Sequence, residues 1–510
     1  MGCVKNIDLH ALLCAVGIYG GNEFFLTDTT CNSCLPIADD ILCWALRAIG
    51  LPFCLLGWHI ACQRATLIFT DHALQAIHTL CRKLLPMPVH STQPIPAAES
   101  EAKTVQLAKT STFSALQHPA FRWFFFGQLV SVSGTWMQSV ALQIVVYAMT
   151  GSKTALGLAA LAQGIPALIL TPFAGVIVEQ LPRRRLLILT QGFMMVLAFI
   201  LAFLYLAEAL EIWHILVISL GVGAATALDA PSRLSFLVEM VGKEDLPSGI
   251  VLNSLMFNTA RIIGPMLGGL ALYSLGAAWC FLLNALSFFA VLFGLFVMRV
   301  PSLPRRKANT AIWKPLFEGL SFARRHATIA PLLLLSALSS SFGLTFTVLL
   351  PPFADTVLGN TELGTSALLT AQGIGALFAS IFVARNVSNG YRGITMVRGA
   401  IIAPMALICL SFTHTLFLAG LATLVAGFGF VCQFVLTNTL IQAEVPDAFR
   451  GRVLSLYTLT FFGLSPIGSL LMGATADQVG TLTAILIFGG ICLVGAFLIT
   501  WRAAELRQLP

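Results

Sequence analysis

The chain has 510 residues, of which 57% are hydrophobic and only 10% are charged, and its mean hydropathy is +0.88. Soluble domains carry charges at about 25% of their positions, so this composition excludes a soluble globular protein and predicts one that lies in a lipid bilayer. The net charge of +7 is spread over short segments, with no basic patch interleaved with aromatic residues, which argues against a nucleic-acid partner.

The first 86 residues differ from everything that follows. They hold eight of the twelve cysteines. Cys31 and Cys34 have the spacing of a metal or redox pair, but no second pair follows at a suitable distance, so no metal site is expected. We expect translation to begin at Met87, which would make residues 1–86 a non-native or poorly ordered extension. Residues 87–112, rich in proline and polar side chains, would then form a disordered leader.

From Phe121 onward the chain holds twelve apolar stretches, each close to the roughly 20 residues that a helix needs to cross a bilayer. Open strands would leave backbone polar groups unpaired in hydrocarbon, so all twelve are predicted to be helices. The predicted spans are 122–148, 155–178, 186–208, 212–230, 250–275, 278–298, 329–351, 364–385, 393–413, 416–441, 452–475 and 481–501. The fold class is therefore an all-α integral membrane protein.

Basic residues gather in alternate connections between the predicted helices. One set of connections is basic throughout, from Arg183–Arg185 to Arg502 and Arg507, whereas the opposite set offers only Lys153. Short loops rich in Lys and Arg stay in the cytoplasm, so we predict that the basic set, and both ends of the helical body, are cytoplasmic.

An internal repeat divides the body in two. Residues 162–165, Ala-Gln-Gly-Ile, recur as residues 371–374 in the second and eighth predicted helices. Pro265 of the fifth helix matches Pro466 of the eleventh, as do the Ser-Leu pairs that precede them. These matches predict two parallel six-helix halves related by an axis along the membrane normal, with a substrate site between them near the midplane.

The predicted division places the N-terminal half at 113–300 and the C-terminal half at 329–502, with a cytoplasmic connection at 301–328 and a short cytoplasmic tail at 503–510. Within the connection, Trp313, Phe317, Leu320 and Ala323 recur at helical spacing. That pattern predicts an amphipathic helix at the membrane interface.

A short polar segment that begins at Gly175 joins the second and third predicted helices and reads Gly-Val-Ile-Val-Glu-Gln-Leu-Pro-Arg-Arg-Arg. A glycine, an acid four residues later and a run of arginines resemble the loop between helices 2 and 3 of the major facilitator superfamily, although Gln180 stands where that family has an arginine. In the family the acid docks on the start of helix 11 in the outward-facing state, where helix-terminal donors favour a negative group. The resemblance implies a conformational switch built from Gly175, Glu179, Arg183, Arg184, Asp229 and Arg233.

The same resemblance implies that the arginine cluster pairs with Asp229. Two simpler interpretations stay open. Arg183–Arg185 can serve as topology signals alone, and Asp229 with Arg233, four residues apart, can form an ordinary ion pair at a helix end.

The fifth predicted helix contains Ala-Arg-Ile-Ile-Gly-Pro-Met-Leu-Gly-Gly at residues 260–269. This segment is similar to the Gly-Pro signature that exporters of the superfamily carry in helix 5. Glycines spaced by four let helices approach closely, and a proline bends the helix, although ordinary tight packing uses glycines as well. The signature residues are Arg261, Gly264, Pro265, Gly268 and Gly269.

Arg261 is a basic residue well inside a predicted span, where a charge costs about 2.5–3.5 kcal/mol on insertion scales. It is expected either to contact an anionic substrate or take part in coupling, or to have a structural partner. Further polar residues at helical spacing are candidates for lining the cavity, although amides also serve as ordinary interhelical hydrogen-bonding groups. These candidates are Gln128, Ser131, Thr135, Gln138, Asn258, Asn284, Gln372, Gln433 and Asn438.

Residues 227–233, 281–288 and 445–457 are similar to a bacterial exporter branch of the superfamily that includes the enterobactin exporter and macrolide efflux pumps. The resemblance implies a secondary active exporter of siderophores, drugs or similar small amphipathic solutes in a bacterial cytoplasmic membrane. Alternatives are a lysolipid flippase or a metabolite importer on the same fold, or a non-transporting membrane sensor.

The expected partners are a small-molecule substrate, protons and the lipid bilayer, and the expected state is a monomer. The sequence has no Gly-x-x-x-x-Gly-Lys-Ser/Thr loop for ATP phosphates, so a proton gradient is the expected energy source, with Asp229 as the candidate carrier. We expect no cofactor and no enzymatic activity, because no nucleophile with its base and no metal-ligand cluster is found in the body.

Overall fold

The computed structural model describes residues 113–298, 300, 313–386 and 390–509. The predictions for residues 1–112 and for the first part of the connection, 301–312, therefore lie outside the described residues.

Helices form the described part of the chain, and twelve spans in it are long and apolar enough to cross a membrane. The first half contains α4 (Pro119–Thr150), α5 (Lys153–Gln180), α6 (Arg183–Leu206), α7 (Ile212–Val241), α8 (Leu246–Leu275) and α9 (Ala277–Val297). The second half contains a segmented span from α11 (Ile329–Leu338) to α12 (Leu350–Leu358), then α13 (Thr361–Asn386), α14 (Arg392–Leu410), α15 (Leu416–Glu444), α16 (Asp447–Val479) and α17 (Thr481–Arg502). The predicted all-α fold with twelve transmembrane helices is confirmed.

Local chemistry sets several helix ends. Helix α4 ends at Gly151, whose backbone is in the left-handed conformation, with φ 61°. Residues with a side chain rarely adopt this conformation without strain, whereas glycine does so readily. Ser152 then begins α5 by accepting a hydrogen bond from the Ala155 backbone N–H, and Thr415 begins α15 by accepting one from Leu418.

The seventh span differs from the single helix predicted at 329–351. It passes from α11 through a π-helical segment (Ser339–Gly343) and a 3₁₀ segment (Leu344–Leu349) into α12. Gln433 of α15 satisfies polar groups of this irregular stretch, because its amide donates to the Leu335 carbonyl oxygen at 3.2 Å and accepts from the Ser339 hydroxyl at 2.9 Å. Irregular backbone at membrane depth requires such internal partners.

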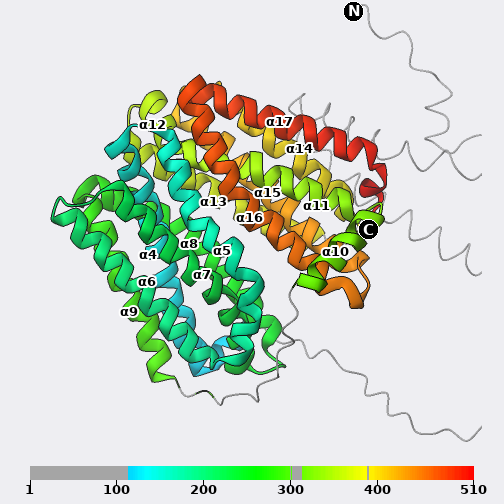
Figure 1. Cartoon of the computed structure of the whole chain (residues 1–510), viewed down its shortest axis with the longest axis horizontal. Helices are drawn as coiled ribbons and strands as arrows, with labels where there is room; N and C mark the ends of the chain where they lie inside the picture. The colour runs from blue at the N-terminus through cyan, green and yellow to red at the C-terminus, as the bar shows by residue number, and fades with distance from the viewer. Residues whose placement is uncertain (1–112, 299, 301–312, 387–389, 510) are drawn as a thin grey trace, which may run out of the picture. The chain divides into compact units, whose positions relative to one another are not determined.

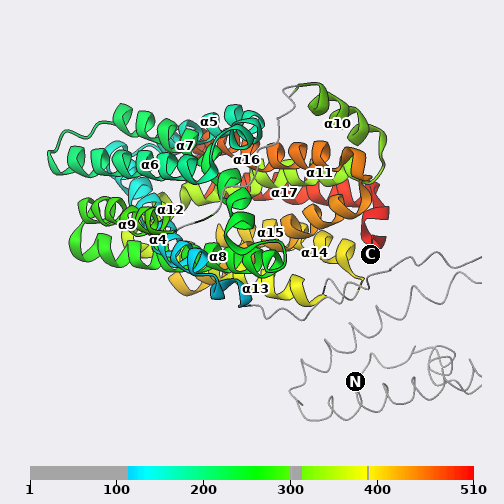
Figure 2. The same cartoon turned by 90° about the horizontal axis from the view of Figure 1, so that it is seen from below.

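The two halves repeat one packing arrangement (Figures 1 and 2). In the first half α5 packs against α7, and in the second half α13 packs against α15. Gly223 of α7 lies so close to the Gln163 carbonyl oxygen that a Cβ would collide with it, and Gly427 of α15 stands in the same relation to Gln372. Gln163 and Gln372 occupy equivalent positions in the predicted repeat, so the duplication extends to backbone contacts.

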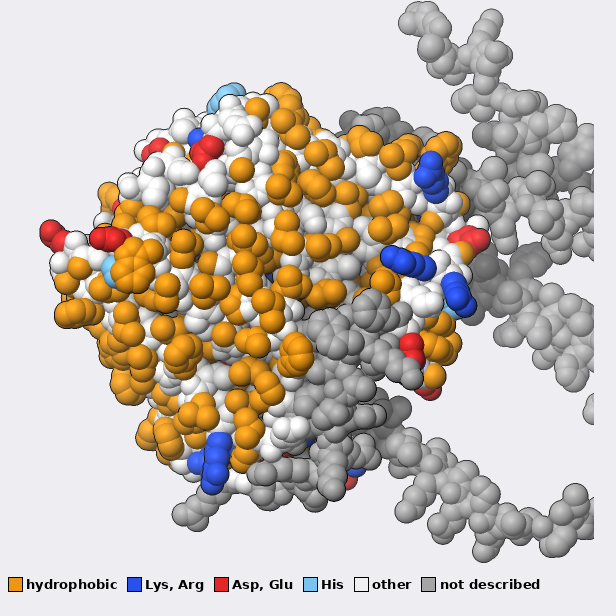
Figure 3. Space-filling view, in the orientation of Figure 1, with side chains coloured by type: hydrophobic (Ala, Val, Ile, Leu, Met, Phe, Trp, Pro, Cys, Tyr) orange, Lys and Arg blue, Asp and Glu red, His pale blue; other side chains and the backbone are white. Residues whose placement is uncertain are grey.

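The surface suits a bilayer. Hydrophobic side chains cover the middle of the face in Figure 3, and charged side chains lie toward its periphery. Large apolar residues with high exposure include Leu189, Phe203 and Phe293. Lipid tails, rather than water, are suited to contact such a surface.

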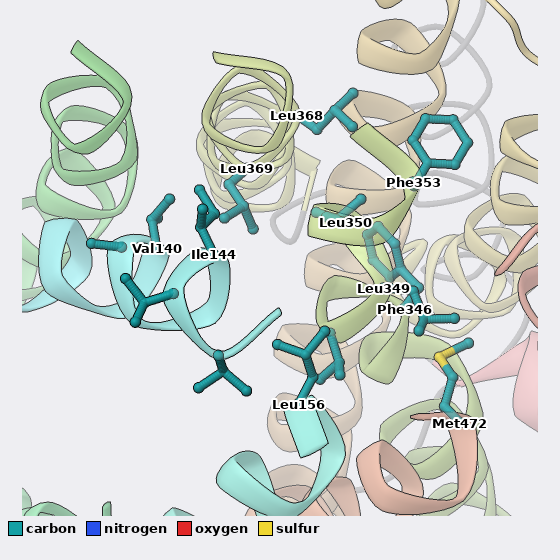
Figure 4. Packing of buried hydrophobic residues seen from close by; sticks show 14 of the residues in the cluster. Val140, Ile144, Leu156, Phe346, Leu349, Leu350, Phe353, Leu368, Leu369 and Met472 are labelled. Carbon is teal, nitrogen blue, oxygen red and sulfur yellow. The ribbon is translucent and has the colours of Figure 1, made fainter. Parts of the chain in front are cut away.

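The hydrophobic core distinguishes the two ends of the body. We call the end that carries the Lys- and Arg-rich connections the basic end and the other the distal end. At the distal end one cluster unites residues of both halves, including Val140 and Leu156 of the first and Leu350, Leu369 and Met472 of the second (Figure 4). At the basic end the buried residues form two separate clusters, one in each half. The halves are therefore packed together at the distal end in this structure.

Candidate functional site

Two helix pairs, α5 with α16 and α8 with α13, form the seam between the halves. Glycines permit close approach along both pairs. A Cβ at Gly157 of α5 would lie 2.6 Å from the Ser469 carbonyl oxygen of α16, and one at Gly269 of α8 would lie 2.5 Å from the Ser366 Cβ of α13. The helices of the seam therefore approach so closely at these glycines that larger side chains have little room.

Asp477, near the end of α16, binds the start of α5 across the seam. Its carboxylate accepts hydrogen bonds from the backbone N–H groups of Lys153 at 2.9 Å and Thr154 at 2.8 Å. It also accepts from the hydroxyls of Ser152 at 2.8 Å and Thr154 at 2.6 Å, and the Lys153 Nζ lies 3.6 Å away. The first N–H groups of a helix lack partners within the helix and favour a negative charge, so the second half supplies a cap for the first.

At the basic end, the side chain of Asp229 in α7 is buried and takes part in hydrogen bonds and an ion pair. It accepts hydrogen bonds from Thr190 at 3.0 Å and Gln191 at 2.8 Å, and it pairs with Arg233 at 3.3 Å. Arg233 also approaches the Gln128 Oε1 of α4 at 3.4 Å. The predicted pairing of Asp229 with Arg233 is present, within a network that connects α4, α6 and α7.

The arginine run at the start of α6 takes different partners from those expected. Arg183 donates to Glu239 at 2.7 Å, and Arg184 donates to the carbonyl oxygens of Leu295 and Phe296 at the end of α9. The expected pairing of these arginines with Asp229 is therefore corrected. The cause is distance along α6, because Asp229 lies level with Thr190 and Gln191, about two turns beyond Arg183.

Gly175 and Glu179 lie in the last two turns of α5. The next helix across the seam, α16, begins at Asp447. Helix α10 (Trp313–Arg325) packs near this start, where Glu318 pairs with Arg452 at 2.7 Å and Phe322 stacks on Phe449 at a centroid distance of 4.5 Å. The predicted helix of the connection thus contacts the second half.

The Gly-Pro signature in α8 divides its contacts between two neighbours. Gly264 faces Trp136 of α4, and a Cβ at Gly268 would lie 3.3 Å from the Met137 Cα of the same helix. Gly269 instead faces α13 across the seam, and Pro265 is buried within α8. The signature therefore packs α8 simultaneously against its own half and the other one. Arg261 lies just before the first of these glycines.

Six of the nine cavity candidates are buried between helices in this structure, namely Gln128, Ser131, Gln138, Asn284, Gln372 and Gln433. Gln138 and Asn284 bond to each other at 2.7 Å and so join α4 to α9. Helix packing covers these six side chains in this conformation, and their role in lining a cavity stays a prediction. The three that retain exposure are Thr135, Asn258 and Asn438.

A pocket of about 560 Å³ opens at the distal end, between the ends of α4 and α8 in the first half and α12 and α13 in the second. Tyr147, Tyr273, Asp355 and Glu362 supply its polar lining. Tyr147 donates to Asp355 at 3.4 Å, and Thr361 does so at 2.9 Å. Sequence reasoning missed this pocket, since its residues come from helices far apart in the chain.

Comparisons with known proteins agree with this architecture. Residues 110–509 match the family described as transmembrane secretion effectors of the major facilitator superfamily. The chain belongs to this family. It is a membrane transporter of small molecules and not an enzyme.

Two relatives illustrate the match. The Staphyloferrin A transporter of Staphylococcus aureus is 26% identical over 396 residues, which cover 76% of this chain and 97% of the relative. The enterobactin exporter EntS of Escherichia coli O1:K1 is 25% identical over 402 residues, which cover 77% and 94%.

Solved structures show the same fold at lower identity. A bacterial homologue of the human lysosomal transporter Spinster, in an inward-facing and unoccupied conformation, has a TM-score of 0.60 and 15% identity, covering 77% of this chain and 99% of that one. The peptide transporter POT has a TM-score of 0.64 and 14% identity, covering 76% and 95%. The major facilitator fold is therefore shown.

Replacing Asp477 should open the distal end. An Asp477→Asn variant loses the charge that caps α5, an interaction of roughly 0.3–2 kcal/mol, so we expect the population with separated distal ends to rise by about two- to thirtyfold. Electron paramagnetic resonance would measure this population from the distance between spin labels at Ala209 and His414, which are exposed distal positions of the two halves. The labels would be placed in a background without native cysteines. Glu505→Gln, an exposed acid far from the seam, is the control, and equal distance distributions for Asp477→Asn and the unmodified protein would refute the cap.

Filling the glycine contact should act in the same direction. We expect Gly269→Val to push α8 from Ser366 of α13 and to lengthen the distance between the same two labels. Gly192→Val places the same side chain in α6, where a Cβ meets nothing within 4 Å, and should leave the distance unchanged. If both valines have the same effect, helix propensity rather than the seam explains the result.

Proposed function

We propose that the protein is a secondary active exporter that carries small amphipathic solutes, siderophores among them, out of a bacterial cell by alternating access driven by protons. The family match, the siderophores that the two relatives transport and the Gly-Pro signature of α8 support this proposal. The observation that carries it is a seam packed at one end only, between two halves that each have their own core at the other end.

Charge supports an orientation for the body. Short connections rich in Lys and Arg stay in the cytoplasm, which would place the basic end inside the cell and both ends of the body with it. The distal end would then face outward. With the halves joined there, this conformation would be an inward-facing one that takes solute from the cytoplasm.

The two antiparallel seam helices α5 and α16 suggest how the states alternate. Each carries an acid near its C-terminal end, Glu179 in α5 and Asp477 in α16. Asp477 caps the start of α5 in the present state, and Glu179 would cap the start of α16 when the basic end closes. One carboxylate would be released as the other docks, so each change exchanges similar interactions of roughly 0.3–2 kcal/mol. The two states would then differ little in free energy, so binding of a proton or a solute could shift the equilibrium between them.

Asp229 is the proposed proton carrier. Its protonation would remove the charge that holds Arg233 and would break a buried network at the basic end. We expect Asp229→Asn to abolish the dependence of transport on a pH gradient and Asp229→Glu to retain it. Gradient-driven flux into proteoliposomes would measure this, with Glu244→Gln, an exposed acid at the same end, as the control. A gradient-driven flux in Asp229→Asn equal to that of the unmodified protein would exclude Asp229 as carrier.

The transport function itself is testable in inverted vesicles that contain the full chain. Addition of a siderophore or an amphipathic dye should dissipate an imposed pH gradient and should load the vesicles with solute. Vesicles with an Asp477→Cys and Ser152→Cys crosslink, which cannot open the distal end, are the matched control. If collapse of the pH gradient leaves every flux unchanged, the proton-driven proposal fails.

A further inference from the structure

Arg261 lies halfway along α8 and has no counter-ion among the residues that the structure describes. Arg183, Arg233 and Arg452 each pair with a carboxylate in the described part of the chain. Arg261 has no ion pair and no hydrogen bond with any described residue. A charge at this depth costs about 2.5–3.5 kcal/mol on insertion scales, and such residues normally pair or serve a function. A purely structural role as an ion-pair or carbonyl-capping residue would require a carboxylate or carbonyl partner, and no described residue supplies one.

The guanidinium lies against an aromatic ring at the seam. Its carbon is 5.8 Å from the ring centroid of Trp136 in α4, and both side chains keep partial exposure. Gly373 of α13 packs directly on the Arg261 carbonyl oxygen, where a Cβ would lie at 3.0 Å. Arg261 is thus positioned where the two halves meet, with one face of its planar group against an apolar surface.

Two hydroxyl groups on the opposing helix are also without partners. Ser366 faces Gly269, and Gly373 faces Arg261, so Thr370 lies between these contacts on the side of α13 that faces α8. The hydroxyl oxygens of Ser366 and Thr370 are buried and accept or donate no hydrogen bond within the described part of the chain. Buried polar groups are normally satisfied, so these two hydroxyls, on the helix that packs on the backbone of Arg261, are available to a further hydrogen-bonding partner.

We propose that Arg261 is the anion-binding residue of the substrate site and that the solute is an organic anion with a carboxylate or similar oxyanion and a flat apolar body. This inference rests on the proposed transport function and names its substrate class. The guanidinium donates a pair of parallel hydrogen bonds to the oxyanion, and the apolar body lies along Trp136. The solute's oxyanion would supply the ion pair that Arg261 lacks among the described residues.

Matched dyes of opposite charge test the proposal. Carboxyfluorescein and rhodamine 6G share a flat xanthene body, but the first is an anion and the second a cation. Fluorescence anisotropy with the purified full chain in detergent measures the binding of each. We expect the unmodified protein to bind carboxyfluorescein and Arg261→Gln to bind it about tenfold to a hundredfold more weakly, as for the loss of a charge-assisted hydrogen-bonded pair.

Two further variants separate binding from folding. Arg261→Lys keeps the charge but loses the paired donors, so we expect an intermediate affinity even if Arg261→Gln folds poorly. Arg502→Gln removes an exposed arginine at the end of α17 and should leave binding unchanged. Thermal unfolding of each variant checks that it is folded.

The outcomes also separate this inference from the transport proposal. Failure of the unmodified protein to bind carboxyfluorescein, or equal binding by folded Arg261→Gln and Arg261→Lys, would overturn the anion site. Gradient-driven flux of rhodamine 6G without recognition of carboxyfluorescein would overturn the site and leave transport standing. No gradient-dependent flux of any solute would remove the transport function on which the site rests.

Discussion

The close contact of α5 with α16 and of α8 with α13 is the constraint on which the rest of the structure depends. Both contacts bring backbones together at glycines, so they tolerate no added side chain and hold the halves in a defined register. Because the shared hydrophobic core is confined to the distal end, the halves can separate at the basic end without exposing it. A seam joined at one end is what alternating access requires of each of its states.

Charged groups in this chain are few and are engaged in different ways. Asp477 caps a helix across the seam, Asp229 is held by an arginine and two neutral donors, and Arg184 caps a helix with its guanidinium. Each arrangement satisfies a group that lipid cannot solvate. Arg261, by contrast, lies midway along its helix and has no carboxylate partner among the described residues, and under the proposed transport cycle a solute would supply the missing negative charge.

Much of the fold could be predicted from the sequence because lipid imposes simple rules. Length and apolar composition indicated the twelve spans, and the matching Ala-Gln-Gly-Ile segments indicated the duplication that Gly223 and Gly427 display. The ion pair of Asp229 with Arg233 followed from helical spacing alone. The break in the seventh span could not be predicted, because it is stabilised by Gln433, which lies almost a hundred residues away.

The candidate site was less predictable, because polar residues that line a cavity and polar residues that join helices recur at the same helical spacing. Gln138 and Asn284 occupy helical stripes as cavity residues would, but they bond to each other inside the first half. Asp477 accepts a hydrogen bond from the Lys153 backbone 324 residues away, and no local sequence motif predicts this contact. Tertiary contacts of this kind decide which polar groups face solute and which hold helices together.

A reversible crosslink across the distal seam tests the central claim most directly. Cysteines at Ser152 and Asp477, whose side chains are 2.8 Å apart in the native protein, would join α5 to α16 in a background without other cysteines. The account predicts that oxidation stops transport and that reduction restores it, because the halves must part there in every cycle. Transport that continues at an unchanged rate with the crosslink complete would contradict it.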